Sequence, residues 1–256
     1  MLYFAYFLLN IFIFFFGVII GSFLNVIIYR VPKEIPFWQG RSYCVSCGKT
    51  IKPYDLIPII SFFILRGRCR NCNNKFSRRY PLVEIITGLI ALVLYWNFGI
   101  SVVSFIYFTV SAILVAISFI DFDTMTIPNG LIITLVIPAM AAVFFVEQTE
   151  ILSRVIGFLA ISLPMFLLTF LIPDCFGGGD IKLIAVCGFI LGWQNILLAA
   201  FIALILGGTY GVILILKNKN NRKIHIAFGQ YICIGVFVAM LYGNIIIDSY
   251  LKIFNL

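Results

Sequence analysis

The sequence contains few charged residues. Only 11% of its 256 residues are Asp, Glu, Lys or Arg, whereas 62% are hydrophobic. A soluble domain carries roughly 25% charged residues, so the composition excludes a soluble protein and indicates an integral membrane protein. The long apolar runs also lack the strict alternation of apolar and polar residues that marks membrane strands. We therefore expect these runs to form helices.

The N-terminus lacks the features of a cleavable signal peptide. No basic residue precedes the apolar part of the first run, and no small-residue cleavage site follows it. We therefore interpret this run as a first membrane span that is retained.

The apolar runs predict an all-α polytopic membrane protein with about eight transmembrane helices, since roughly 20 apolar residues cross a bilayer. We expect one span over residues 1–30, a small cytoplasmic domain over 31–80, and a membrane domain of about seven spans over 81–256. The approximate spans are residues 2–28, 81–98, 102–120, 131–146, 151–172, 182–192, 196–216 and 228–247.

Positive charge is concentrated in two clusters. Eleven of the eighteen Lys and Arg residues lie in residues 30–79, and four more lie in residues 217–223. A basic patch can bind nucleic acid, but in a membrane protein the positive-inside rule is the commoner cause. We therefore expect both clusters in the cytoplasm and no nucleic-acid partner. Eight spans counted from an external N-terminus also place residues 121–130 and 173–181 on the cytoplasmic side.

Two carboxylates stand at the ends of apolar runs on this predicted cytoplasmic side. Asp121 follows the run 102–120, and Asp180 precedes the run that starts at Leu183. An acid at a membrane edge is costly unless it has a partner or a function. Two such acids can share a proton and activate a water, as in aspartic proteases. Alternatively, each acid caps the end of its own helix.

The sequence around both acids resembles a known family. Residues 177–180 read Gly-Gly-Gly-Asp and fit the GxGD motif of intramembrane-type aspartyl proteases. Asp121, followed by Ile-Pro-Asn at 127–129, is similar to the first aspartate motif of type IV prepilin peptidases. Residues 21–32 and 77–84 also resemble that family, and the resemblance extends from about residue 17 to about residue 231.

One segment within this range departs from the family pattern. Residues 226–231 are similar to the family's Ile-Pro-Phe-Gly-Pro segment, but Ala227 and Gln230 replace both prolines. The two replacements bear on the predicted shape of this loop and not on the assignment of the two acids.

The resemblance implies that Asp121 and Asp180 form a catalytic dyad. One acid is protonated, and the other takes a proton from the water that attacks the peptide carbonyl. Asp123 lies about 200° around the helix from Asp121, so both cannot face Asp180 equally. The family pattern selects Asp121 and leaves Asp123 as an auxiliary group or a substrate contact.

Three further residues are expected to shape the site. Gly177 and Gly179 either form a flexible turn or let an extended substrate backbone approach the acids. Lys182 either holds Asp180 in its ionised form or extends its side chain to the membrane interface.

Four cysteines form two CxxC pairs. Cys44 and Cys47 make the first pair, Cys69 and Cys72 the second, and 21 residues separate the pairs. This spacing suits a tetrahedral structural zinc ion. The predicted cytoplasmic location argues against stable disulfides, and a redox CxxC normally occurs once, in a thioredoxin-like setting. We therefore predict zinc bound by these four residues.

The resemblance implies a prepilin peptidase of the inner (plasma) membrane. It would cleave the short basic leader of type IV prepilins and pseudopilins after a glycine, at the cytoplasmic face. Members with the cysteine-bearing loop commonly also N-methylate the new N-terminus with S-adenosylmethionine. The sequence shows no glycine-rich nucleotide fingerprint, so methylation rests on the resemblance.

Two other classes of protein are alternatives. A transporter that binds cations through paired acids would place them near mid-span and show repeated discontinuous helices. Here the acids lie at span ends, and no internal repeat is visible. A membrane thiol-disulfide oxidoreductase would need a CxxC pair on the oxidising side, which the predicted topology contradicts.

The predicted topology can be tested by thiol labelling. Thr124→Cys and Gly178→Cys, each in a background without native cysteines, would place a thiol beside each acid. We expect a membrane-impermeant reagent to label both in inverted vesicles and neither in intact cells, because hydrolysis needs water and the leader stays cytoplasmic. Labelling of either position from outside would contradict the topology.

Overall fold

The structure is a computed structural model that describes residues 2–147, 149–172, 175–217 and 226–253. His225 and most of the second basic cluster lie outside these residues. The described parts are helical, and their β-structure is limited to two isolated bridges, Tyr43 with Thr50 and Arg68 with Lys75. The chain divides into two compact units, Met1–Ile100 and Ser101–Leu256.

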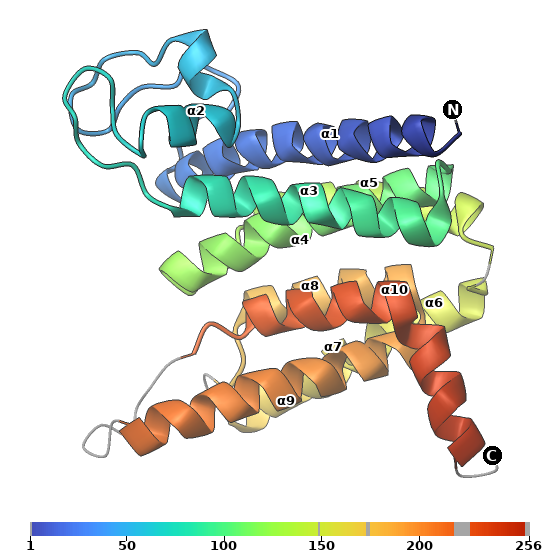
Figure 1. The fold of residues 1–256 in the computed structure, drawn as a ribbon. Helices are drawn as coiled ribbons and strands as arrows, with labels where there is room; N and C mark the ends of the chain where they lie inside the picture. The colour runs from blue at the N-terminus through green and yellow to red at the C-terminus, as the bar shows by residue number, and fades with distance from the viewer. Residues whose placement is uncertain (1, 148, 173–174, 218–225, 254–256) are drawn as a thin grey trace. The chain divides into compact units, whose positions relative to one another are not determined.

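The first unit consists of two long helices and a loop domain. Helix α1 packs along α3, and the loop domain gathers where α1 ends and α3 begins (Figure 1). The apolar residues 56–65 contain only the end of η2 and the five-residue helix α2, which is too short to span a membrane. The elements are α1 (Leu2–Arg30), η1 (Val31–Lys33), η2 (Pro53–Leu56), α2 (Ile60–Ile64) and α3 (Arg79–Phe98).

Glycines let α1 and α3 approach closely. A Cβ atom at Gly17 would lie 2.7 Å from the carbonyl oxygen of Thr87, and one at Gly21 would lie 2.8 Å from Cα of Glu84. Small residues at helix contacts are the usual means by which membrane helices associate. The same contact buries the polar side chains of Thr87 and Glu84.

The second unit is a bundle of seven helices within the described residues. Helix α4 packs against α5 and α10, and α8 contacts α5, α6, α9 and α10. The shared neighbours α5 and α10 therefore connect α4 to α8. The helices are α4 (Val102–Thr124), α5 (Asn129–Phe145), α6 (Ile151–Ala160), α7 (Ser162–Leu171), α8 (Gly178–Leu191), α9 (Trp193–Lys217) and α10 (Gly229–Ile253).

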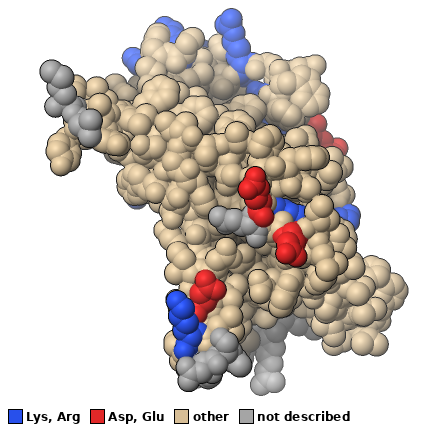
Figure 2. Space-filling view, turned by 90° about the vertical axis from the view of Figure 1, so that its right-hand side faces the viewer, with Lys and Arg blue, Asp and Glu red and all other residues tan. Residues whose placement is uncertain are grey.

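The helices make this a multi-pass membrane protein. Six segments among the described residues are long and apolar enough to cross a bilayer, with α6 and α7 together forming one of them. Charged side chains are sparse on the face seen in Figure 2. Helices α5 and α8 are shorter, at 17 and 14 residues, so the count of eight spans stays a prediction.

Arg154 is a buried cation that sequence reasoning missed. Its side chain is 0% exposed, although it lies in an apolar helix. The guanidinium donates hydrogen bonds of 2.8–3.4 Å to five backbone carbonyls, those of Ala142, Val146, Thr149, Phe189 and Ile190. Carbonyls at helix C-termini carry partial negative charge, so Arg154 joins the ends of α5 and α8. A lone arginine within an apolar run was the available signal.

We expect Arg154→Met to destabilise the protein by about 3 kcal/mol, because it leaves buried carbonyls without donors. Arg154→Lys should lose less, since an ammonium keeps three donors. Thermal unfolding of purified protein in detergent measures the change. Lys252→Met, at an exposed position in the last turn of α10, is the matched control. An unfolding temperature of Arg154→Met equal to that of wild type would contradict the assignment.

Candidate active site and metal centre

Asp121 lies in the last turn of α4. Its side chain is only 4% exposed. The helix ends at Met125, which has a left-handed backbone with φ of 52° and donates its N–H to the Asp121 carbonyl at 2.8 Å. Pro128 then precedes the first residue of α5. This tight connection holds the buried acid at the edge of the bundle.

Asp180 lies in the first turn of α8. The helix begins four residues earlier than the span expected from residue 182, and Gly177 is its N-terminal flanking residue. A Cβ atom at Gly177 would lie 3.0 Å from Asp180 Oδ2. The other carboxylate oxygen, Oδ1, is buried and accepts no hydrogen bond from the described residues.

The two acids are close enough to interact electrostatically. They differ in their partners. The backbone N–H of Gln230, at the start of α10, donates to Asp121 Oδ2 at 3.3 Å, and a Cβ atom at Gly229 would lie 2.9 Å from the same oxygen. A helix N-terminus favours negative charge, and each acid lies at one: Asp121 at the start of α10 and Asp180 in the first turn of α8. The acids differ at Asp180 Oδ1, which is buried and has no donor among the described residues.

Sequence reasoning missed this contribution of α10. In the sequence, segment 226–231 shows only its likeness to a proline-containing family segment and gives no sign of a contact with Asp121. Because Gln230 stands where that pattern has a proline, it retains the N–H that reaches Asp121.

The glycines of the GxGD motif allow neighbouring atoms to pack closely against the start of α8. Gly177 has an ordinary φ of −66°, and Gly179 is not among the residues with positive φ. A Cβ atom at Gly179 would lie 2.9 Å from Cβ of Ile127, and one at Gly229 would lie 2.9 Å from Cδ1 of the same residue. Ile127 therefore packs against the starts of both α8 and α10.

Lys182 and Asp123 are close in sequence to Asp180 and Asp121, but their surroundings differ from those of these two acids. Lys182 donates from Nζ to Asn129 Oδ1 at 2.9 Å and so ties the start of α8 to the start of α5. Its hydrogen bond is to this amide rather than to Asp180. Asp123 is exposed, two residues beyond the buried Asp121.

The four predicted metal ligands come together in the first unit. The sulfur atoms of Cys44, Cys47, Cys69 and Cys72 all lie within 4.8 Å of one another. Their chemistry and number fit a tetrahedral zinc site.

The two cysteine pairs share one backbone arrangement. In each pair the first cysteine donates its N–H to a carbonyl five residues later, that of Lys49 or Asn74, at 2.9 Å. The residue after the second cysteine is left-handed, with φ of 69° at Gly48 and 57° at Asn73. Glycine and asparagine are the residues that adopt this conformation most readily.

The thiols cannot all ionise easily without a cation. Burial raises the pKa of Cys44, but hydrogen bonds from the Cys47 and Ser46 backbone and from neighbouring thiols outweigh it and lower the pKa to about 7. The Asn74 backbone lowers the pKa of Cys72, yet desolvation and the three other sulfurs raise it to about 11. A bound zinc ion would supply the charge that four thiolates need.

Comparison with known proteins gives matches along most of the chain. Residues 15–98 match the Bacterial Peptidase A24 N-terminal domain, and residues 107–212 match the Type IV leader peptidase family. No solved structure gives a significant match.

Several curated proteins named "Prepilin leader peptidase/N-methyltransferase" are similar over nearly their whole length. The one from Bacillus subtilis is 32% identical, over 94% of this chain and 97% of its own. The one from Legionella pneumophila is 32% identical, over 92% of each chain. The one from Pseudomonas aeruginosa is 29% identical, over 92% of this chain and 91% of its own.

We expect purified protein to contain about one zinc ion per chain, because four thiolates at this spacing form a closed site. Elemental analysis by mass spectrometry measures the content. The double variant Cys44→Ser/Cys72→Ser should lose the metal, whereas Cys175→Ser, an exposed cysteine outside the cluster, should keep it. Freshly reduced wild-type protein without metal would rule out the zinc site.

Proposed function

The chain belongs to the type IV leader peptidase family, and we propose that it cleaves the leader peptides of type IV prepilins and pilin-like proteins at the cytoplasmic face of the inner (plasma) membrane. This membership confirms the resemblance predicted from the two aspartate motifs. The observation that carries the catalytic proposal is that Asp121 and Asp180 come from two different helices and meet around Ile127. This residue packs against Gly179, the neighbour of Asp180, and against Gly229, which lies beside Asp121 Oδ2. The family is one of aspartic peptidases, and the transporter alternative gains no support.

We propose different roles for the two acids because their hydrogen-bond partners differ. Asp121 accepts a hydrogen bond from the start of α10, which favours its carboxylate form. We assign it as the base that takes a proton from the attacking water. Asp180, with its buried and unpaired Oδ1, is assigned as the protonated partner. Its proton polarises the scissile carbonyl and then passes to the leaving amine.

The remaining site residues frame this chemistry. Gly177 and Gly179 keep side chains away from Asp180 and Ile127, so that an extended peptide backbone can approach the acids. Lys182 holds Asn129 and thereby fixes the start of α8, which carries Asp180. Asp123, exposed beside the site, is positioned to contact the basic leader of the substrate.

The substrates proposed are prepilins or pseudopilins with a short basic leader and an apolar N-terminal helix. Such a helix remains in the lipid bilayer while its leader stays in the cytoplasm, which places the scissile bond at the membrane edge. The names of the relatives include N-methyltransferase. We therefore propose that methylation of the new N-terminus follows cleavage, with S-adenosylmethionine as the methyl donor and zinc as a structural metal.

We expect Asp121→Asn and Asp180→Asn each to lower prepilin cleavage by at least about a hundredfold, because a proton-sharing dyad needs both members. Cleavage of a purified prepilin, followed by mass spectrometry, measures the rate.

The neighbouring variant Asp123→Asn is the matched control and should keep clear activity. Normal processing by Asp180→Asn protein would refute the dyad. An inactive Asp123→Asn together with an active Asp121→Asn would identify Asp123 as the catalytic acid instead.

A further inference from the structure

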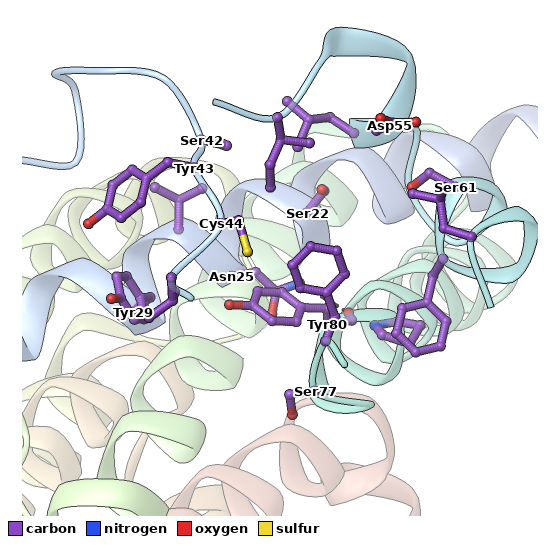
Figure 3. A pocket seen from close by; sticks show the side chains of 18 of the residues that line it. Ser22, Asn25, Tyr29, Ser42, Tyr43, Cys44, Asp55, Ser61, Ser77 and Tyr80 are labelled. Atoms are coloured by element: carbon purple, nitrogen blue, oxygen red, sulfur yellow. Dashed lines mark hydrogen bonds between the residues drawn. The ribbon is translucent and has the colours of Figure 1, made fainter. Parts of the chain in front are cut away.

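The first unit contains a cavity that the peptidase dyad does not use. It has a volume of about 520 Å³, and all of its lining residues fall between Ser22 and Glu84. In Figure 3, Tyr29 and Tyr43 lie on one side of the view, Asp55 and Ser61 lie on the other, and Tyr80 lies between them. Cavities of roughly 300–1,000 Å³ hold small-molecule ligands.

Glu84 is the acid of this cavity without a cationic partner. The other lining acid, Asp55, is bound by Arg70 through three hydrogen bonds of 2.7–3.2 Å. Glu84 forms no salt bridge with a described residue. Glu84 is 7% exposed and interacts with the Ser22 hydroxyl and the Ile59 backbone. A buried acid in these surroundings is a site for a positive charge.

The two lining cations lie in the same cavity without forming a salt bridge to Glu84. Arg30 is 6% exposed and directs its guanidinium to the carbonyls of Pro36, Gln39 and Arg41. Lys75 belongs to the second cysteine pair's backbone bridge with Arg68. The charge of Glu84 therefore stays available to a ligand.

A strained turn covers this acid. Ile59 has φ of 60° and ψ of −55°, a conformation that is rare and costly for a β-branched residue. Its N–H donates to Glu84 Oε2 at 2.7 Å. Backbone strain of this kind concentrates at ligand sites, so the turn and the acid point to a binding function.

The rest of the lining is rich in aromatic rings, including those of Tyr29, Tyr43, Phe62 and Tyr80. Aromatic faces together with a carboxylate bind organic cations. The ring of Tyr29 already holds the ammonium of Lys33, 3.8 Å from its centroid. We propose, on the basis of the proposed function, that this cavity is the methyl-transfer site and binds the sulfonium of S-adenosylmethionine between Tyr80 and Glu84. Methyl transfer would then take place in the first unit, at a different site from peptide cleavage by the dyad in the second unit.

The cavity also provides a proton acceptor for the transfer. When bound, S-adenosylmethionine supplies an electrophilic methyl group. The lone pair of the substrate's N-terminal amine forms the new N–C bond as the S–C bond breaks, and the S–C bonding electrons remain on sulfur as a neutral thioether. The amine's surplus proton passes to the carboxylate of Glu84.

Direct binding to full-length protein in lipid nanodiscs tests the site. Isothermal titration compares S-adenosylmethionine with S-adenosylhomocysteine, which lacks the positive charge. We expect Glu84→Gln and Tyr80→Leu to weaken S-adenosylmethionine binding at least about tenfold and S-adenosylhomocysteine binding much less. Ser61→Trp, which fills the cavity, should weaken both ligands.

Glu34→Gln is the matched control, because Glu34 is an exposed acid of the same unit that does not line the cavity. Zinc content and unfolding temperature verify that each variant folds, and Tyr80→Leu tests the site if the Glu84→Gln protein does not fold.

Three results would overturn the inference: no S-adenosylmethionine binding by wild type, unchanged binding by Ser61→Trp, or equal loss of both ligands in Glu84→Gln and Tyr80→Leu. The last result would indicate an apolar occupant, such as a lipid chain. Prepilin cleavage by wild type tests the proposed peptidase separately. Cleavage without binding would refute only the methyl-transfer site, and binding without cleavage would refute only the peptidase.

Discussion

The second unit depends on how it stabilises a carboxylate at the end of a membrane helix. Removing an ion from water costs several kcal/mol, and Asp121 is almost fully buried. The start of α10 offsets part of this cost with a backbone N–H. Helices α4, α8 and α10 must therefore end at one place, and the glycines at 177, 179 and 229 allow them to meet.

The same constraint explains Arg154. A buried guanidinium without a carboxylate needs many acceptors, and carbonyls at the ends of α5 and α8 provide them. The last carbonyls of a helix have no partner within that helix, and an apolar environment offers no water to replace it. Arg154 thus joins the C-terminal ends of α5 and α8, whose N-terminal ends carry Asn129 and Asp180. The packing that stabilises the bundle therefore also positions Asp180.

The loop domain of the first unit is stabilised in a different way. Its loop domain is too small and too polar to form a large apolar core, and the four cysteines take the place of one. The paired backbone turns at Gly48 and Asn73 bring the sulfurs together. The same loop closes over the start of α3 and encloses the aromatic cavity around Glu84. The cysteine cluster and the cavity are therefore both formed by one folded loop.

The sequence by itself determined the membrane class, the helical architecture, the cysteine cluster and the family, because each depends on composition or on short motifs with fixed spacing. It also selected Asp121 and Asp180 as the acids of interest. Only the tertiary structure decided that Gln230 reaches Asp121, that Lys182 binds Asn129, and that Arg154 and Glu84 are buried. These features join residues 50 or more positions apart or depend on backbone atoms and burial, which helix packing sets and local sequence patterns do not encode.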